Sequence, residues 1–463
     1  MLDLVLLAFI LGMLALGLRR PFIWVLTYLY IDIVAPQKIG WGIIQAIPLS
    51  FIAFIAAFTG WALFDSKEGS RFTFRQGLIL ALLLWCGWTT LNADFPIDAL
   101  TKWDWVWKAL IFAIFLPLTL RTKLRIEAAA LVMAFSVGAI IISGGIKTIL
   151  SGGGYGTLSS LVQSNEGLYE GSTLSMVAIS VIPLFLWVAR HGTIFPKSRW
   201  TILFAAGLIF AALLVPVGTQ TRTGLVCIAV LGVLMLRSVK NRFLYAGLGA
   251  VALMAAIPFL PQSFTERMET ISNPEGDESA STRLAVWQWT IDYVGEKPLG
   301  GGFDAFRGNS FTYRMRIEEG PQDNSRVRYE KVIDEGRAYH SSYFEVLGEQ
   351  GWPGLALWLW IHALGLWQME RIRRRMKARE TPEEKRWYEL ATALQHGQAV
   401  YLVGALFVGI AYQPFVFYLV ALQIALASLL SRNASAKPKF APKRPKKQTA
   451  EPPAGSSPGE APA

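Results

Sequence analysis

The sequence is poor in charged residues. Asp, Glu, Lys and Arg make up only 17% of its 463 residues, well below the roughly 25% that is usual in soluble domains. This shortage excludes a large soluble domain. Hydrophobic residues make up 53% of the chain, and runs of about 17 to 25 apolar residues, long enough to cross a bilayer as helices, recur from Val5 to Leu430.

Cysteine is also scarce. Cys86 and Cys227 both lie inside apolar runs, so neither a disulfide framework nor a zinc cluster is supported. The acidic pairs lack the regular spacing of a calcium loop. The glycine triplets at 152–154 and 300–302 do not follow a strand and precede a helix, as a nucleotide-binding loop would. We expect no metal and no cofactor.

The apolar runs predict an all-α polytopic integral membrane protein with about 12 transmembrane helices. Membrane helices are expected over residues 1–260 and 341–432, and a long extracytoplasmic loop with short helices over 261–340. Two arginines follow the first run and no basic residue precedes it, the reverse of a signal peptide, so this run should remain as an anchor. Residues 433–463 have the composition of a disordered cytoplasmic tail.

The net charge of +11 arises mainly in short loops and in the tail. Loops rich in Lys and Arg alternate with loops that are poor in both, and the basic loops of a membrane protein stay in the cytoplasm. The loops assigned to the cytoplasm contain Arg19/Arg20, Lys67/Arg71/Arg75, Arg121/Lys123/Arg125, Arg190/Lys197/Arg199, Arg237/Lys240/Arg242 and the segment from Arg371 to Arg386. The basic run at 371–375 is typical of an anchor near anionic membrane lipids, and we expect no nucleic-acid partner.

The long loop contains one recognisable helix signal. The segment 281–298 starts with a plausible helix cap, ends at a proline, and places Leu284, Trp287 and Ile291 on one face. We therefore predict a short amphipathic helix. The remainder, 307–337, mixes charges of both signs and is expected to form a solvated lid.

Three residues on the extracytoplasmic side could carry chemistry: Arg222, Arg283 and His340. An arginine presents a fixed, always-charged fork that suits phosphate, and two such forks could hold a pyrophosphate. A histidine with a pKa near neutrality can take a proton from an attacking hydroxyl. The other histidines lie in a cytoplasmic loop (His191) or within or beside apolar helices (His362 and His396), where packing explains them.

Each of the three also has a purely structural interpretation. Arg222 could reach along its helix to the lipid headgroups. Arg283 is one of several basic residues in its loop and could be a solvated charge. His340 could serve as a local hydrogen-bonding residue.

Four segments carry a resemblance to a known family. They are SLVQSNEGLYEGSTLSMVAISVIPL from Ser160, TQTRTG from Thr219, STRLAVWQWTIDYVGEKPLGGGF from Ser281, and HSSYFEVLGEQGWPG from His340. Together they resemble the bacterial O-antigen ligase and O-antigen polymerase superfamily, including its branch of O-glycosylation ligases associated with exosortase. The last segment is the most specific, because it is similar to the family's histidine and glycine-spaced helix entrance.

The resemblance implies a type-C-like membrane glycosyltransferase that uses an undecaprenyl-pyrophosphate-linked glycan and needs neither a nucleotide sugar nor a metal. It assigns the family's essential arginines to Arg222 and Arg283, for pyrophosphate binding, and its catalytic histidine to His340. Gln163 and Asn165 occupy a region where relatives carry another polar motif, which makes them possible substrate-binding residues. The local sequence SNEG departs from the usual form of that motif.

The resulting functional hypothesis is an O-antigen ligase of lipopolysaccharide biosynthesis. It would transfer a glycan, with inversion, from undecaprenyl pyrophosphate to a hydroxyl of lipid A-core oligosaccharide, at the periplasmic face of the bacterial inner membrane. A protein O-glycosylation ligase and an O-antigen or exopolysaccharide polymerase remain alternatives, because all would use the same donor. A flippase for the same lipid-linked glycan is less favoured, because transporters usually carry polar groups near the bilayer midplane.

Overall fold

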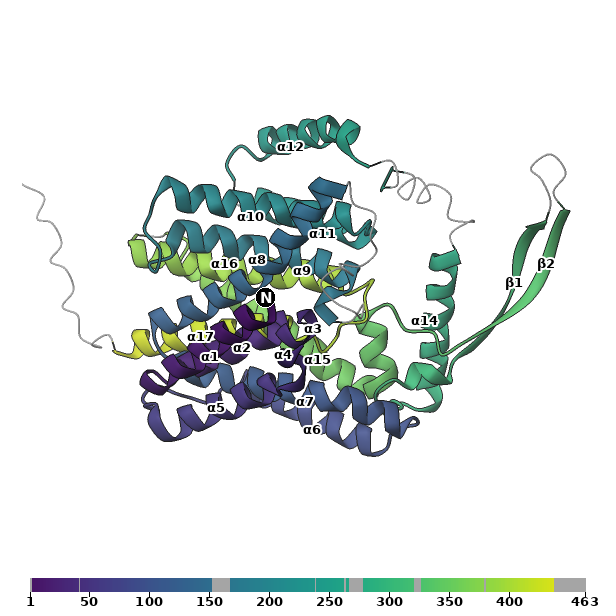
Figure 1. Ribbon diagram of the computed structural model, residues 1–463, viewed down its shortest axis with the longest axis horizontal. Coiled ribbons are helices and arrows are strands. Elements are labelled where there is room, and N and C mark those ends of the chain that lie inside the picture. Colours follow the sequence, from purple (N-terminus) through teal and green to yellow (C-terminus); the bar gives the residue numbers. More distant parts are fainter. Residues whose placement is uncertain are drawn as a thin grey trace, which may run out of the picture.

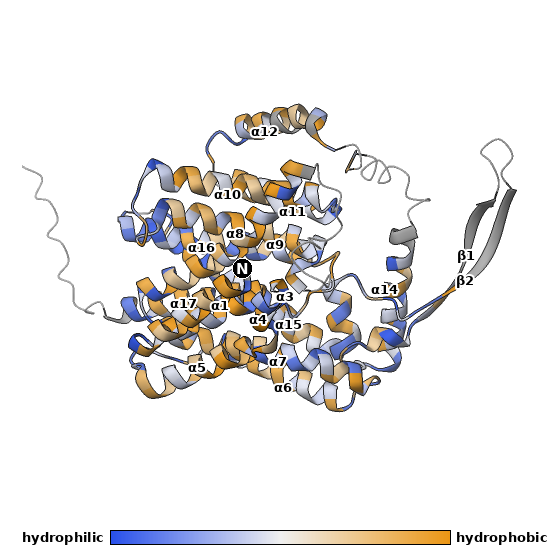
Figure 2. Cartoon of the chain, viewed as in Figure 1, coloured by the Kyte–Doolittle hydropathy of each residue, from blue (hydrophilic) through white to orange (hydrophobic). Residues whose placement is uncertain are grey.

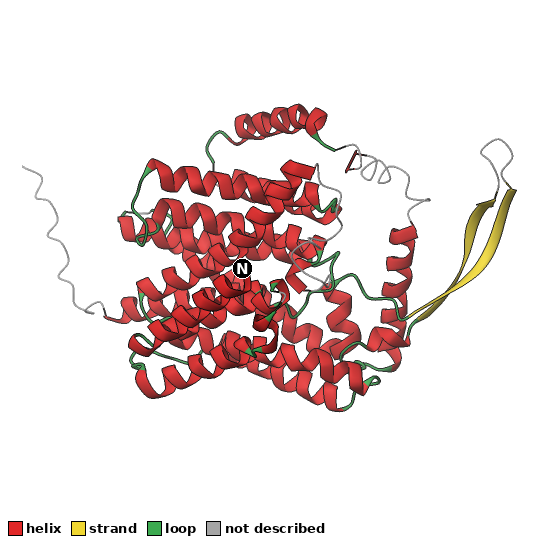
Figure 3. Ribbon diagram, in the orientation of Figure 1, coloured by secondary structure: helices red, strands yellow, loops and turns green. Residues whose placement is uncertain are grey.

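The computed structural model describes residues 2–40, 42–151, 167–237, 239–261, 264–265, 278–319, 326–378 and 380–436. Across these residues the chain is mostly helical and contains one two-stranded sheet (Figure 3). Gln163, Asn165 and most of the expected C-terminal tail lie outside the described residues.

Most of the helices run alongside one another in one bundle (Figure 1). The bundle contains α1 (Leu2–Arg19), α2 (Phe22–Val34), α5 (Leu49–Phe64), α6 (Phe74–Leu91), α7 (Pro96–Thr119), α8 (Lys123–Ser151), α9 (Gly171–His191), α10 (Arg199–Gly218), α11 (Arg222–Leu236), α15 (Ser342–Arg375), α16 (Pro382–Gly404) and α17 (Pro414–Ala436). The short helices α3 (Pro36–Ile39), α4 (Ile43–Ala46) and η1 (Gly167–Tyr169) lie in its connections. Helix α12 (Arg242–Ala256), followed by η2 (Ile257–Phe259), lies along the outside of the bundle.

Within the described part of the chain, six segments are long and apolar enough to cross a membrane. They are Phe22–Ile39, Phe74–Leu91, Lys123–Leu150, Gly171–His191, Arg199–Gly218 and Pro414–Ala434. Three shorter apolar helices, α5, α11 and α12, accompany them. Apolar residues dominate the bodies of the bundle helices, and polar residues gather towards their ends (Figure 2). These features are those of a multi-pass helical membrane protein, whereas the count of about 12 spans stays a prediction.

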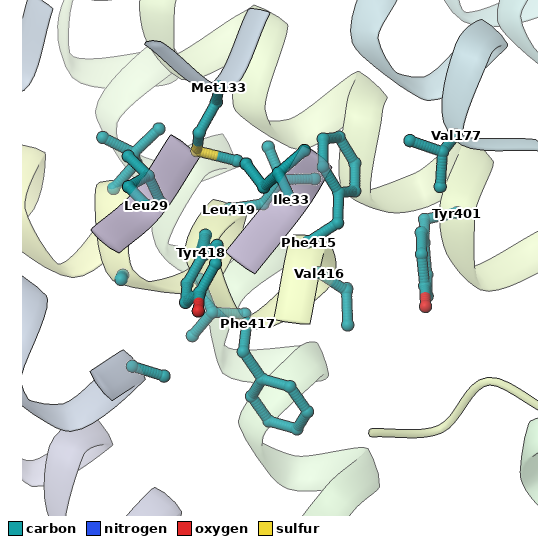
Figure 4. Packing of buried hydrophobic residues seen from close by; sticks show 14 of the residues in the cluster. Leu29, Ile33, Met133, Val177, Tyr401, Phe415, Val416, Phe417, Tyr418 and Leu419 are labelled. Atoms are coloured by element: carbon teal, nitrogen blue, oxygen red, sulfur yellow. The ribbon is translucent and has the colours of Figure 1, made fainter. Parts of the chain in front are cut away.

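The core of the bundle is centred on α17. Each residue from Phe415 to Leu419 is no more than 2% exposed, as expected for a helix that is apolar around its whole circumference. Tyr418 packs edge-on against Phe112 of α7, with ring centroids 5.4 Å apart. Figure 4 shows the same part of α17 beside Leu29 of α2 and Met133 of α8. The C-terminal helix is therefore enclosed by helices from the N-terminal half.

The loops predicted to be cytoplasmic meet at one end of the bundle. Asp65, in the loop after α5, accepts a hydrogen bond of 2.6 Å from Arg125 at the start of α8. Glu127, one turn into α8, pairs with Arg386 near the start of α16. Further pairs at this end are Arg121–Asp65, Lys123–Glu383 and Arg237–Glu370. The charge pattern thus grouped these loops correctly, and the side of the membrane that they face stays a prediction.

The helix predicted in the long loop is present as α14 (Glu278–Glu296). Its buried face, however, differs from the one that the sequence indicated. Leu284 and Ile291 are 62% and 46% exposed, whereas Val286, Thr290 and Val294 are at most 1% exposed. The spacing of these three residues, four apart, marks the face that packs on the protein.

The segment expected to form a lid contains regular structure that the sequence did not predict. After the short helix η5 (Ala305–Gly308), strands β1 (Ser310–Glu319) and β2 (Arg326–Glu335) pair antiparallel, with Ser310 opposite Glu335. The two strands project from the bundle beside α14 (Figure 1). They return the chain to the entrance of α15, where His340 lies.

Candidate active site

His340 lies at the entrance of α15, one residue before the N-cap Ser341. Its backbone is left-handed, with a φ of 47°, a conformation that non-glycine residues seldom adopt and that is common at functional sites. Ser342 fixes this entrance: its backbone N–H donates to Ala405 O at 2.8 Å, and its hydroxyl donates to Val408 O at 2.8 Å. The histidine is therefore held against the turn that joins α16 to α17.

Arg283 belongs to the same site because α14 packs on the entrance of α15. Trp287, one turn after Arg283, donates its indole N–H to Tyr339 O at 2.9 Å. Its ring stacks on Phe344, with centroids 4.8 Å apart and an interplanar angle of 6°. Residues four apart share a helix face, so Arg283 lies on the face of α14 that is turned towards His340.

The surroundings of His340 lower its pKa below the ordinary value. The imidazole is exposed at the site, but the largest cause is the partial loss of its hydration, which disfavours the charged form. The positive charges of Arg283 and Arg337 lower the pKa further, and the carboxylate of Glu170 opposes them. His340 is therefore neutral at pH 7, which is the form that a general base requires.

Arg222 begins α11 and follows a strained turn. Gln220 has a φ of 51°, and the hydroxyls of Ser175, Thr219 and Thr221 lie within 2.7–3.2 Å of one another. This hydroxyl cluster fastens the Arg222 turn to α9. The Arg222 side chain is half-buried.

The N-terminal end of α9 connects the Arg222 turn with His340. Glu170, whose charge acts on His340, caps α9 through the N–H groups of Ser172 and Thr173, at 2.9 and 2.6 Å. Ser175, in the hydroxyl cluster, lies five residues further along the helix, a rise of about 7.5 Å. The structure thus brings Arg283 and His340 together and places the Arg222 turn on the adjoining part of α9.

Two residues of the site were missed in the sequence. Arg337 lies three residues before His340 and is fixed on both sides: it pairs with Asp334, and its backbone N–H donates to Asn309 Oδ1 at 2.8 Å. Glu170 lies in the segment GLYEGST, and its position there indicates a helix cap but no interaction with His340. Only the folded chain shows that both charges act on His340.

Fold and site together define a multi-pass helical membrane protein with a basic, histidine-containing site at one end of its bundle. Residues 206–359 match the family described as O-antigen ligase, and this segment contains Arg222, Arg283 and His340. The match supports the resemblance of this segment to the O-antigen ligase superfamily. Residues 1–193 match a family of unknown function, DUF5935. No curated protein matches the chain.

Proposed function

We propose that the protein is a glycan ligase that transfers a glycan from undecaprenyl pyrophosphate to a hydroxyl of lipid A-core oligosaccharide. The observation that carries this proposal is the juxtaposition of Arg283 with a neutral, backbone-strained His340 inside the O-antigen ligase match. The arginine suits the donor's pyrophosphate, and the histidine suits the acceptor's hydroxyl proton. The site would face the periplasm of a bacterial inner membrane.

The proposed mechanism is a single displacement at the anomeric carbon. Arg222 and Arg283 hold the pyrophosphate, and the acceptor hydroxyl approaches from the opposite side of the sugar. His340 takes the hydroxyl proton while the new glycosidic bond forms and the bond to the pyrophosphate oxygen breaks, which inverts the configuration. Pyrophosphate is a good leaving group, so charge stabilisation by the arginines replaces a general acid. The pair of carboxylates used by glycosidases is not needed.

A host that lacks this gene provides the test. The deletion strain is complemented with wild type, with His340→Ala, or with His191→Ala at matched expression. His191 lies at the other end of α9 from the site and serves as the matched control. We expect the deletion and His340→Ala to lack decorated lipopolysaccharide and to accumulate long undecaprenyl-linked glycan. Wild type and His191→Ala should restore both pools.

The two pools also separate the alternatives. Unchanged lipopolysaccharide in the deletion strain would overturn the lipid A-core acceptor and direct attention to secreted glycoproteins. Single repeat units on the lipid carrier in place of long chains would indicate a polymerase. Accumulation of the lipid-linked glycan only on the cytoplasmic side of the membrane would indicate a flippase.

A further inference from the structure

Four charged side chains from three elements meet behind the entrance of α15. Lys102 Nζ, on α7, lies 2.7 Å from Glu345 Oε1 and 2.6 Å from Glu349 Oε1, both on α15. It also lies 3.7 Å from Asp304 Oδ1, in the segment that follows α14. Two aromatic rings, each with its centroid 5.5 Å from the ammonium, cover it. We call these four residues the Lys102 cluster.

Lys102 is the main compensation for the negative charge of this cluster. The Glu349 side chain is 0% exposed, and among the described residues its Oε2 atom has no hydrogen-bond partner. A buried carboxylate without a cation is costly. The ammonium therefore holds the three carboxylates, and the elements that carry them, in one place.

The cluster fastens the segment after α14 to the second turn of α15. The Asp304 N–H donates to Glu349 Oε1 at 3.0 Å, and the Gly302 N–H donates to the backbone oxygen of Glu349 at 2.9 Å. The Gly301 N–H donates to Gly348 O at 3.1 Å. Backbone, carboxylate and ammonium thus form one junction between the two elements.

This junction connects the same two elements that carry the candidate site. α14 carries Arg283, and α15 begins directly after His340. The Trp287 indole joins the middle of α14 to the residue before His340, and the Lys102 cluster joins the end of α14 to α15. With both attachments in place, Arg283 has a fixed position relative to the imidazole.

We propose that Lys102 and Glu349 are positioning residues, which hold the Arg283 segment against the His340 helix and so set the spacing between pyrophosphate and base. This inference rests on the proposed function. Neither side chain touches substrate: both act through the position of the two site residues. A displacement of about 1 Å can cost on the order of 10²-fold in rate.

Transfer kinetics with purified protein test the positioning role. Lys102→Met should lower kcat by on the order of 10²-fold, and Lys102→Arg, which keeps the cation, should retain most of it. Because Arg283 would move away from His340, the acid limb of the pH profile should also shift to higher pH in Lys102→Met. Arg337 and Glu170, the other charges acting on His340, remain unchanged. A mere loss of folded protein would lower the rate without moving this limb.

Lys108→Met is the matched control, because Lys108 lies on the same helix but pairs with an exposed carboxylate, Asp104, at 2.9 Å. It should leave both the rate and the acid limb unchanged. An unshifted limb in Lys102→Met, or full activity in that variant, would overturn the inference.

An accessibility experiment tests the junction without any activity. Ala305, next to Asp304, is 1% exposed, and both native cysteines are buried, so Ala305→Cys should resist a maleimide in an otherwise wild-type chain. Adding Lys102→Met should make this cysteine reactive, and adding Lys102→Arg or Lys108→Met should not. Continued protection in Lys102→Met would overturn the junction. Absence of glycan transfer by wild type would overturn the proposed function alone, because the labelling result still decides the junction.

Discussion

Backbone strain in the described residues is concentrated around the site. Four non-glycine residues have positive φ values, and three of them lie at or near the site. Gln220 lies two residues before Arg222, Asp304 belongs to the Lys102 cluster, and His340 is the site histidine. Strain of this kind persists only where the surrounding structure enforces it. Backbone φ angles cannot be read from a sequence, so this strain could not be predicted from the residues alone. The residue types led to the prediction of Arg283 and His340 as site residues, which stays a prediction, but they did not indicate that the charges of Arg337 and Glu170 act on the imidazole.

The pH dependence of transfer should report the charges around His340. Its pKa is lowered by desolvation, by Arg283 and by Arg337, and raised by Glu170. The base must be neutral, so activity is lost as pH falls through this pKa. Arg283→Gln removes a cation, which raises the pKa and moves the acid limb to higher pH. Glu170→Gln removes an anion and moves it to lower pH. Measuring kcat/KM across pH 4–8, roughly the range in which His titrates, checks the direction of both shifts. If the acid limb lay at the same pH in both variants, His340 would not be the base that these charges affect.

The arginine fork, rather than its charge alone, should determine donor binding. Arg283→Lys keeps the cation and loses the bidentate geometry, so we expect the KM for the lipid-linked donor to rise about 10- to 100-fold. Arg307→Lys is the control: it belongs to the same loop, but Arg307 forms a half-exposed ion pair of 3.0 Å with Asp98, and such pairs contribute little. Donor KM values of purified variants check this. Wild-type affinity in Arg283→Lys would exclude bidentate pyrophosphate binding there.

At the scale of elements, periodicity found α14 but not its orientation. Cap and apolar spacing were enough to place a helix near 281–298, yet the buried face carries Val286, Thr290 and Val294. A threonine at the centre of that face hid it from an apolar pattern. The hairpin β1–β2 was missed for a related reason: its strands, SFTYRMRIEE and RVRYEKVIDE, lack a clean alternation of apolar and polar residues.

One of the two attachments between α14 and the α15 entrance depends on the Trp287 indole. Trp287→Phe keeps a stacking ring for Phe344 but removes the 2.9 Å hydrogen bond to Tyr339 O. A hydrogen bond of this kind contributes about 0.5–1.5 kcal/mol, so we expect kcat to fall about 2- to 10-fold. Trp289→Phe is the matched control, because Trp289 stacks on Tyr293 within α14 itself. Equal rates for both variants would show that the Trp287 contact does not position the site.

The kink in α15 should tolerate no side chain. Gly351 has a φ of 64°, and an added Cβ would collide with the Pro298 carbonyl oxygen and lie 2.6 Å from the Gly300 nitrogen. Gly351→Ala should therefore destabilise the fold by about 3 kcal/mol or more. Gly295→Ala, in α14 with no atom within 4 Å of its added Cβ, should instead stabilise by about 0.5–1 kcal/mol. Thermal unfolding in detergent compares the two variants. Unchanged stability of Gly351→Ala would contradict the close packing of residues 298–300 against Gly351.

At the scale of the whole molecule, charge and hydropathy were sufficient to predict a helical membrane protein and to group its basic loops. They did not predict a polar network inside the bundle. Arg75 donates to Gln368 and Gln423 at 2.8 and 2.9 Å, and Gln423 continues through Gln398 to His362. Arg75 was predicted to lie in a cytoplasmic loop, whereas it lies in the first turn of α6 and is 5% exposed. Its two partners lie on α15 and α17, 293 and 348 residues further along the chain, so the sequence did not indicate this contact. The case against a flippase therefore has to rest on experiment and not on an apolar interior.

The orientation of the bundle decides whether the site can meet a periplasmic donor. Gln288, on α14, and Lys197, in the loop before α10, are both exposed and belong to opposite predicted sides. Both native cysteines are buried, so a single introduced cysteine gives a clean signal. We expect a membrane-impermeant maleimide to label Gln288→Cys in intact spheroplasts and Lys197→Cys only after the membrane is permeabilised. The reverse pattern would place Arg283 and His340 in the cytoplasm, where an acceptor on the outer leaflet of the inner membrane could not reach them.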